Sequence, residues 1–193
     1  MPPPPPAQPS LPTYRLIYYR GRGRAEAIRY MLVLSGKGFD DCRISISQWK
    51  TIKEREGLGE DSKLPVLEID NKELIIGAAN IGRHLANEFG FYGKSDKERA
   101  EIDEILEEIE AMYPNLTPVV RAALGKNDRQ KRASWEAYKE STLTTALTSF
   151  SKRLGQNRFF VGGNLTWADL AVAEMLTRFE QCYEGSCLRD WGT

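Results

Sequence analysis

The sequence is poor in the residues that build metal sites and disulfide frameworks. It contains three cysteines, Cys42, Cys182 and Cys187, and a single histidine, His84. An odd, sparse set of cysteines gives no disulfide framework, and no two of them form a C-x-x-C pair, which argues against a dithiol redox site. With one histidine and scattered cysteines, the usual ligand sets for zinc cannot be assembled, so we expect no metal.

The sequence also lacks an excess of charge of one sign and any long apolar run. Lysine plus arginine and aspartate plus glutamate number 27 each among 193 residues, so the formal net charge is zero. Proteins that bind nucleic acids usually carry a basic excess, so we expect no nucleic-acid partner. No apolar run reaches the roughly 20 residues that a membrane-spanning helix needs, so we expect no membrane partner either.

The N-terminal stretch lacks the features of a secretory signal. Residues 1–12 include five consecutive prolines, without a basic region or an apolar stretch, so we expect a cytoplasmic protein. Consecutive prolines favour a polyproline II conformation and a solvated, disordered tail. This proline-rich tail is either a ligand for a proline-recognition domain or, as we favour, an extension without its own function.

Residues 13–90 predict an α/β domain in the order strand, helix, strand, strand, strand, helix. The first strand is apolar or aromatic on both faces, which suits a central buried position. A strand, a helix and a second strand in succession indicate a parallel pair. Proline is confined to the start or edge of a strand, so Pro65 marks the start of the third one. The strands are expected over 14–19, 39–46, 64–69 and 73–76, the helices over 24–34 and about 80–89, and a short polar segment over 48–56.

Residues 94–193 predict an all-helical domain. Ser95 and Glu98 form a capping box, and apolar residues follow at helical spacing. Pro114 and Pro118 are expected to kink or divide this first helix. A second helix is expected over about 128–154 and a third from Thr166, where the carboxylate of Asp169 can return a hydrogen bond to the cap. The third helix is strongly apolar and is therefore expected at the centre of the domain.

One tyrosine stands where it could do chemistry. Tyr18 ends the first strand and faces the start of the following helix, where free N–H groups and a partial positive charge favour an anionic sulfur or oxygen. From these residues alone, Tyr18 is either a packed strand tyrosine or a group that contacts a thiol.

Three motifs together resemble the cytosolic glutathione transferases, in particular the sigma-like class with its nematode relatives and the S-crystallins of cephalopod lenses. The motifs are Tyr14-Arg-Leu-Ile-Tyr-Tyr19 followed by Arg22-Gly-Arg-Ala-Glu26, Leu64-Pro-Val-Leu-Glu68, and Phe160-Val-Gly-Gly-Asn-Leu-Thr-Trp-Ala-Asp-Leu170. The resemblance covers residues 13 to about 185. It implies a thioredoxin-like N-terminal domain, a helical-bundle C-terminal domain and, usually, a homodimer.

The resemblance implies a glutathione site in the first domain. Tyr18 matches the catalytic tyrosine, whose hydroxyl hydrogen-bonds the glutathione thiolate and lowers the pKa of the thiol. Arg24 matches an arginine that supports this tyrosine electrostatically, although a solvated helix arginine fits the position as well. Trp49 and Lys53 match the residues that hold the glycine carboxylate, and both side chains are hydrogen-bond donors. Leu64 matches the residue whose backbone pairs with the cysteinyl part of glutathione like a sheet edge.

The site departs from the family pattern in two places. Pro65 fits its structural role of keeping the Leu64 edge open, but Lys63 replaces the usual glutamine before it. Gly77 and Ala78 replace the Gln-Ser pair that, with the helix N-terminus, grips the γ-glutamyl carboxylate. Losing two hydrogen bonds to a charged group costs about 3–6 kcal/mol, at about 1.5–3 each. Lys63 could recover part of this loss.

Two functions remain open. The first is glutathione conjugation to hydrophobic electrophiles, or a sigma-type isomerisation such as prostaglandin H to D, with glutathione as co-substrate. The alternative is a weakly active or non-catalytic binding or structural protein like the S-crystallins, which the replacement at Gly77-Ala78 favours. A thioredoxin-type oxidoreductase and a cysteine-type transferase are disfavoured, because no cysteine ends the first strand.

The helical domain is the less informative part of the resemblance. The electrophile pocket is expected to involve Tyr19, Met112 and Tyr113, and Glu107 lies near an acidic residue that reaches the neighbouring subunit's glutathione in the family. The family continues past Cys187 with further helix, so we expect a C-terminally truncated form.

Overall fold

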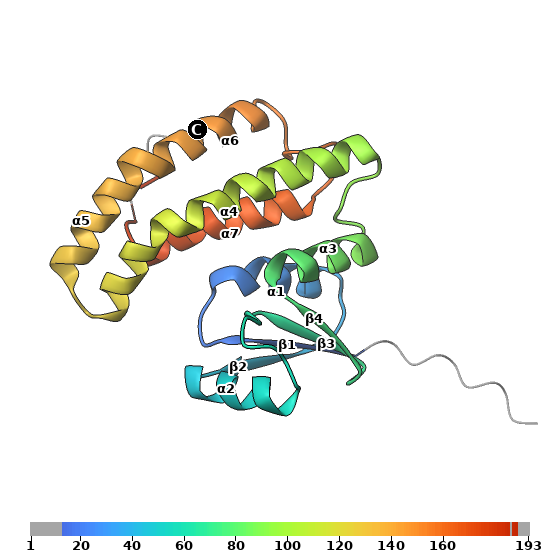
Figure 1. Cartoon of the computed structure of the whole chain (residues 1–193). Helices are drawn as coiled ribbons and strands as arrows, with labels where there is room; N and C mark the ends of the chain where they lie inside the picture. The colour runs from blue at the N-terminus through green and yellow to red at the C-terminus, as the bar shows by residue number, and fades with distance from the viewer. Residues whose placement is uncertain (1–12, 186, 189–193) are drawn as a thin grey trace, which may run out of the picture. The chain divides into compact units, whose positions relative to one another are not determined.

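The computed structural model describes residues 13–185, 187 and 188 (Figure 1). The expectations for the proline-rich tail and for the C-terminal end of the chain lie outside these residues. The chain forms two compact units, and the division between them falls within helix α3, between His84 and Leu85. The domain limits 13–90 and 94–193 stay predictions.

The first unit is built on a four-stranded mixed sheet in the order β2-β1-β3-β4. Strand β1 (Tyr14–Tyr19) pairs in parallel with β2 (Phe39–Ile44) and antiparallel with β3 (Val66–Ile69), which pairs antiparallel with β4 (Glu73–Ile76). The central position predicted for the first strand is thus confirmed. It explains why β1 is apolar on both faces, since a strand covered on both sides must bury both sets of side chains.

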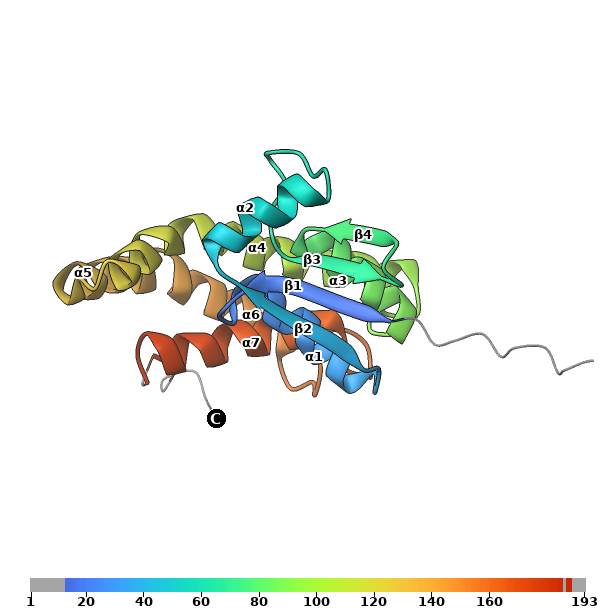
Figure 2. The same cartoon turned by 90° about the horizontal axis from the view of Figure 1, so that it is seen from below.

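Three helices and one 3-10 turn accompany this sheet. They are η1 (Gly23–Ala25), α1 (Glu26–Leu34), α2 (Ile46–Arg55) and α3 (Ala78–Phe89). Helix α1 and the start of α3 lie on one face of the sheet and α2 on the other (Figures 1 and 2).

Helix α2 corrects two expectations, the short polar segment over 48–56 and the extension of β2 to residue 46. The Ser45 hydroxyl accepts a hydrogen bond from the Gln48 N–H at 3.3 Å, and the Gln48 side-chain oxygen accepts one from the Ser45 N–H at 2.8 Å. This reciprocal capping box satisfies N–H groups that the first helical turn leaves open. The polar composition reflects a helix that buries Trp49, half-buries Ile52 and Lys53, and exposes its other residues.

The hairpin between β3 and β4 closes with a tight turn. Asp70 and Asn71 have φ values of 54° and 55°, the left-handed pair that a tight two-residue hairpin requires. At the other end of β3, the Leu64–Pro65 peptide bond is cis. The strand itself begins one residue after this proline, at Val66.

The second unit is helical, as predicted. It contains α4 (Asp96–Leu124), α5 (Asp128–Tyr138), the π-helical segment η2 (Lys139–Leu143), α6 (Thr144–Leu154) and α7 (Trp167–Cys182). Helix α4 runs through both of its prolines, so they do not divide it. The single helix expected over 128–154 contains the π-helical segment between two α-helices.

Helix α7 lies at the centre of this unit, as its apolar sequence predicts. Its Phe179 ring packs against Trp135, Tyr138 and Tyr183, with ring centroids 5.6 to 6.1 Å apart. At its start, the Asp169 carboxylate accepts hydrogen bonds from the cap and from the preceding loop, which fixes where the helix begins.

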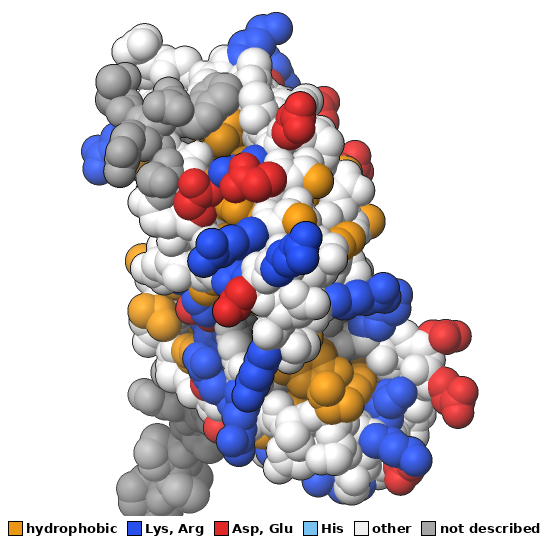
Figure 3. All heavy atoms as spheres, turned by 90° about the vertical axis from the view of Figure 1, so that its left-hand side faces the viewer, with side chains coloured by type: hydrophobic (Ala, Val, Ile, Leu, Met, Phe, Trp, Pro, Cys, Tyr) orange, Lys and Arg blue, Asp and Glu red, His pale blue; other side chains and the backbone are white. Residues whose placement is uncertain are grey.

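The surface carries both signs of charge. On the face in Figure 3, lysine and arginine side chains lie among aspartates and glutamates. Within residues 13–185, 187 and 188, none of the helices combines the length and apolarity needed to cross a membrane.

Candidate functional site

The loop after β1 folds back so that its backbone meets the Tyr18 hydroxyl. The backbone N–H of Arg24 donates to the Tyr18 hydroxyl oxygen at 3.3 Å. Gly23 has a φ of +52°, and a Cβ at this position would lie 2.6 Å from the same oxygen. Glycine is therefore the residue that lets the backbone approach so closely. A phenol oxygen that accepts one hydrogen bond can still donate its own proton to a ligand.

Arg24 takes part through its backbone. Its side chain is exposed, and the electrostatic support predicted for its guanidinium stays a prediction. Tyr19, the next residue of β1, has its ring centroid 5.6 Å from that of Tyr18.

A buried arginine lies beneath this loop, and the sequence reasoning missed it. Arg29 of α1 is only 5% exposed. Its guanidinium donates to the Glu26 carboxylate at 2.7 Å, to the Asp41 carboxylate at 2.9 Å and to the Gly21 carbonyl at 3.1 Å. The carbon of the guanidinium lies 6.0 Å from the centroid of the Tyr18 ring. The available signal was a Glu-x-x-Arg pair on a face whose other members are apolar.

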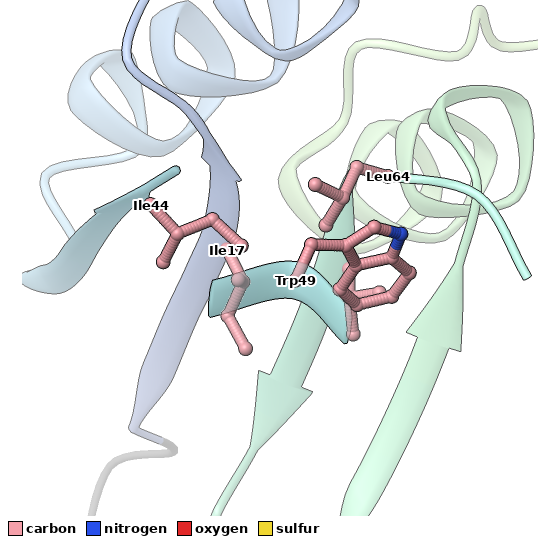
Figure 4. Close-up of a cluster of buried hydrophobic side chains, with 5 residues drawn as sticks. Ile17, Ile44, Trp49 and Leu64 are labelled. Atoms are coloured by element: carbon pink, nitrogen blue, oxygen red, sulfur yellow. The ribbon is translucent and has the colours of Figure 1, made fainter. Parts of the chain in front are cut away.

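Two residues predicted to hold the glycine carboxylate lie together. Trp49 is 7% exposed and packs in a cluster with Ile17, Ile44 and Leu64 (Figure 4). The Lys53 ammonium lies 5.8 Å from the Trp49 ring and donates to the Glu60 carbonyl at 3.0 Å. Within the described part of the chain, the Trp49 indole N–H has no hydrogen-bond acceptor, so it is available to a carboxylate.

The cis-proline segment and the start of α3 are joined directly. The Gly77 N–H donates to the Pro65 carbonyl at 2.9 Å. The Leu64 backbone forms no hydrogen bond with any residue in the described ranges, although Leu64 as a whole is only 9% exposed. The first N–H groups of α3, on Ala78 and its neighbour, are those that any helix leaves without an internal partner. The Leu64 backbone and the helix N-terminus together suit a peptide ligand with a carboxylate.

Polar side chains are sparse at this helix start. Gly77 and Ala78 have none to offer, and the Asn80 amide donates to the Ile76 carbonyl at 3.0 Å instead. Lys63 is exposed and stands directly before Leu64. The predicted roles of Lys63, Gly77 and Ala78 in binding a γ-glutamyl carboxylate stay predictions.

Three residues of the helical unit were predicted near ligands. Glu107 is exposed on α4. The Tyr113 hydroxyl accepts a hydrogen bond from the Arg178 guanidinium at 3.3 Å. Met112 is 4% exposed and lines a small internal void with Met175. Its side chain packs in the helical core, and its expected place in an electrophile pocket stays a prediction.

Acidic, histidine and cysteine side chains are the groups that could hold a metal ion. Among them, no group of three or more histidine, cysteine, aspartate or glutamate side chains is arranged to hold an ion. Cys42, Cys182 and Cys187 are all free thiols.

Comparison with known sequences points to one family. A family model described as "Glutathione S-transferase, C-terminal domain" matches residues 115–191. Probable glutathione S-transferase 9 of Caenorhabditis elegans is 32% identical over 164 residues, which cover 84% of this chain and 78% of the relative. S-crystallin 4 of Enteroctopus dofleini is 30% identical over 170 residues, which cover 83% of this chain and 78% of the relative.

Solved structures agree with the sequence relatives. The monomeric Na-GST-3 of Necator americanus superposes with a TM-score of 0.78 at 29% identity, covering 92% of this chain and 85% of that chain. The glutathione S-transferase of Ascaris lumbricoides gives 0.75 at 27% identity, with the same coverages. The predicted thioredoxin-like domain followed by a helical bundle is thereby confirmed. The four-stranded sheet, the tyrosine at the end of its central strand and these relatives lead to one conclusion: the chain belongs to the glutathione transferase family, beside its nematode members and the S-crystallins.

Proposed function

We propose that this chain binds glutathione in its first unit and conjugates the glutathione thiol to hydrophobic electrophiles. The observation that carries the proposal is the Tyr18 hydroxyl, which the Gly23–Arg24 backbone holds at the end of β1. A thiol has an ordinary pKa of about 8.5 and is therefore mostly protonated at neutral pH. A hydrogen bond donated to the thiolate favours the ionised, nucleophilic form.

The remaining contacts to glutathione follow from the site. The Trp49 indole and the Lys53 ammonium bind the glycine carboxylate, and Lys53 exchanges its bond to the Glu60 carbonyl for it. The Leu64 backbone pairs with the cysteinyl backbone, and Pro65 keeps it in place. The γ-glutamyl carboxylate lies at the start of α3, near Gly77 and Ala78, with Lys63 as the charged partner.

A second candidate is a weakly active or non-catalytic protein. The observation that favours it is the pair Gly77-Ala78, which offers no polar side chain at the start of α3, together with the S-crystallin relatives. A sigma-type isomerisation of prostaglandin H stays a prediction. The solved structures named after prostaglandin D synthesis are 24% identical to this chain and show the fold alone.

The homodimer, the cytoplasmic location and the part of Arg24 in supporting Tyr18 are also proposals. One related structure is described as monomeric, so the subunit number of this chain needs a direct measurement, such as light scattering across a range of concentrations.

Calorimetric titration with glutathione separates the two candidates. If Lys63 completes the site, the wild-type chain binds in the micromolar to low-millimolar range, and Lys63→Ala weakens binding by about tenfold, the equivalent of one charge-assisted hydrogen bond. Lys72→Ala is the matched control, because Lys72 is an exposed lysine in the β3–β4 turn of the same unit. A folded chain that binds no glutathione at several millimolar supports the non-catalytic candidate.

The role of Tyr18 is tested by the ultraviolet absorbance of the bound thiolate as a function of pH. Removing a hydrogen bond to a charged group loses about 1.5–3 kcal/mol, so Tyr18→Phe should raise the pKa of the bound thiol by about 1–2 units. Tyr19→Phe, one residue along the same strand, should leave that pKa unchanged. Equal values in wild type and Tyr18→Phe contradict the assigned role.

A further inference from the structure

We propose that Arg29 is a positioning residue for Tyr18, holding the loop after β1 in the shape that places the Arg24 N–H on the tyrosine hydroxyl. This inference rests on the proposed role of Tyr18 in thiol ionisation. It assigns the buried charge cluster of α1 and β2 to the reaction, in addition to its part in the stability of the first unit.

The burial of Arg29 needs an explanation. A cation removed from water is costly unless it is paired and hydrogen-bonded. Two carboxylates meet this cation, Glu26 from α1 and Asp41 from β2. Its Nη2 nitrogen is nevertheless buried and bonds nothing within the described residues. The two ion pairs therefore do not use all the hydrogen-bond donors of the guanidinium. Its other contacts are with the loop and with Tyr18.

Those remaining contacts are the Gly21 carbonyl and the Tyr18 ring. The Arg29 Nη1 group donates to the Gly21 carbonyl at 3.1 Å, two residues before Gly23. The guanidinium carbon lies 6.0 Å from the Tyr18 ring centroid, near the limit of a cation–π contact. Arg29 therefore interacts with both sides of the contact between the Arg24 N–H and the Tyr18 hydroxyl. It bonds to the loop at Gly21 and lies beside the Tyr18 ring.

A second arginine also joins the loop to α1, but this one belongs to the loop. Arg22 reaches from the loop to α1, where it donates to the Tyr30 hydroxyl at 2.9 Å and lies 4.0 Å from the Glu26 carboxylate. Glu26 is therefore shared between a loop arginine and a helix arginine. A loop held at both Gly21 and Arg22 has little freedom to move the following Gly23–Arg24 backbone away from Tyr18.

A neighbouring arginine supplies the matched control. Arg43 also pairs with Asp41, at 2.8 Å, but its side chain is 44% exposed. Among the described residues, its side chain has one hydrogen bond and one ion pair, both to Asp41 and none to the loop, while its backbone is the cross-strand partner of Tyr18 in the β1–β2 ladder. Arg43→Gln therefore removes an ion pair from the same carboxylate without disturbing the loop.

The experiment compares Arg29→Gln, Arg29→Lys and Arg43→Gln in the full chain. The measured quantities are the pKa of the bound glutathione thiol, from thiolate absorbance, and the KM and kcat for conjugation. We expect Arg29→Gln to raise the thiol pKa by about one unit and lower kcat by about tenfold near neutral pH, with KM for glutathione little changed. Arg29→Lys should give a smaller rise in the same direction, because an ammonium cannot span all three acceptors. Arg43→Gln should match wild type.

A double variant separates positioning from simple destabilisation. If Arg29 acts through Tyr18, Arg29→Gln adds no further shift of the thiol pKa in a Tyr18→Phe background. Two results would overturn the proposal. One is a folded Arg29→Gln variant whose bound thiol has the wild-type pKa. The other is an Arg29→Gln substitution that shifts the thiol pKa equally in the wild-type and Tyr18→Phe backgrounds. Should Arg29→Gln fail to fold, Arg29→Lys decides, and an unshifted thiol pKa there overturns it. A wild-type chain that binds glutathione without lowering its thiol pKa refutes the proposed function, and this inference with it.

Discussion

Gly23 makes the contact between loop and tyrosine possible. Its φ of +52° is a conformation that side chains with a Cβ rarely adopt, and the space for a Cβ is taken by the Tyr18 hydroxyl. Gly23→Ala should displace that hydroxyl and destabilise the fold by about 1 kcal/mol. With the Tyr18 hydroxyl out of place, kcat/KM for conjugation to a chlorinated nitrobenzene should fall by about tenfold or more.

Gly21→Ala is the matched control for this substitution. Gly21 lies two residues earlier in the same loop, has no positive φ, and nothing lies within 4 Å of the position its Cβ would take. Its activity and melting temperature should stay close to wild type. If both alanine variants behave alike, the close approach at Gly23 is not what positions Tyr18.

The two residues that meet this loop differ in how well the sequence predicts them. Tyr18 could be singled out because it ends a central strand within a recognisable motif. Arg29 could not, because a Glu-x-x-Arg pair is as common on a solvated helix face as in a buried cluster. Only the position of Asp41 on the neighbouring strand, 2.9 Å from the guanidinium, shows which case applies. Whether such a residue is buried or solvated depends on contacts between segments that are far apart in the sequence. Local sequence patterns do not contain that information.

The start of α7 depends on one carboxylate. Asp169 accepts hydrogen bonds from the Phe160 N–H at 2.8 Å, the Thr166 N–H at 2.7 Å and the Thr166 hydroxyl at 2.8 Å. An asparagine of the same shape has only one acceptor oxygen, so Asp169→Asn leaves at least one buried donor unsatisfied. We expect a loss of about 1–3 kcal/mol in the free energy of unfolding, measured by urea denaturation.

Asp96→Asn tests whether this loss comes from the hydrogen bonds or from the charge near a helix start. Asp96 lies in the first turn of α4, fully exposed, and its contact is an ion pair with Arg99 at 3.5 Å. If helix-dipole attraction were the main term, both variants would lose similar stability. The hydrogen-bond explanation requires the loss at Asp169 to be much the larger one.

The helices and strands also differ in how well local sequence patterns predict them. Capping at Thr166 was predictable, because the signal lies within four residues and an apolar run follows it. Helix α2 has a comparable box at Ser45 and Gln48, but the alternation of Ile44 with Ile46 imitated a strand. The π-helical segment η2 had no local signal that we could identify. Strand pairing and helix continuity depend on packing against other elements, which overrides weak local preferences.

Across the whole molecule, a switch from alternating to helical periodicity at about residue 95 was enough to predict a sheet-containing part followed by a helical part. The connection lengths account for the parallel pair β1–β2 and for the hairpin pair β3–β4, whereas the antiparallel pairing of β1 with β3, which completes the order β2-β1-β3-β4, is seen only in the structure. The buried polar groups of the helical unit, such as Glu174 and Arg178, lay beyond sequence reasoning. Their burial follows from where α7 packs.

A buried and a half-buried tyrosine of the helical unit, Tyr138 and Tyr183, should lower the stability of the chain at alkaline pH. Burial raises the pKa of Tyr138 and of Tyr183 above the ordinary value of 10.0, although the Arg178 charge opposes the shift. Above about pH 10 the unfolded chain releases these protons while the folded chain keeps them. The unfolded state then binds fewer protons, so stability present below pH 10 is lost as the pH rises, by up to about 1.4 kcal/mol per pH unit from Tyr138, with a contribution of the same sign from Tyr183.

Tyr138→Phe separates this proton linkage from packing. The Tyr138 side chain is buried, and its hydroxyl has no hydrogen-bond partner in the described part of the chain, so phenylalanine should be nearly neutral at pH 7. Tyr113→Phe, which removes the acceptor of Arg178, should instead lose about 1 kcal/mol or more at pH 7. Between about pH 10 and pH 11, urea denaturation should show a decline in stability that is shallower in Tyr138→Phe than in wild type by about 1 kcal/mol per pH unit. Equal slopes in the two proteins would mean that Tyr138 ionises in the folded state as readily as in the unfolded chain.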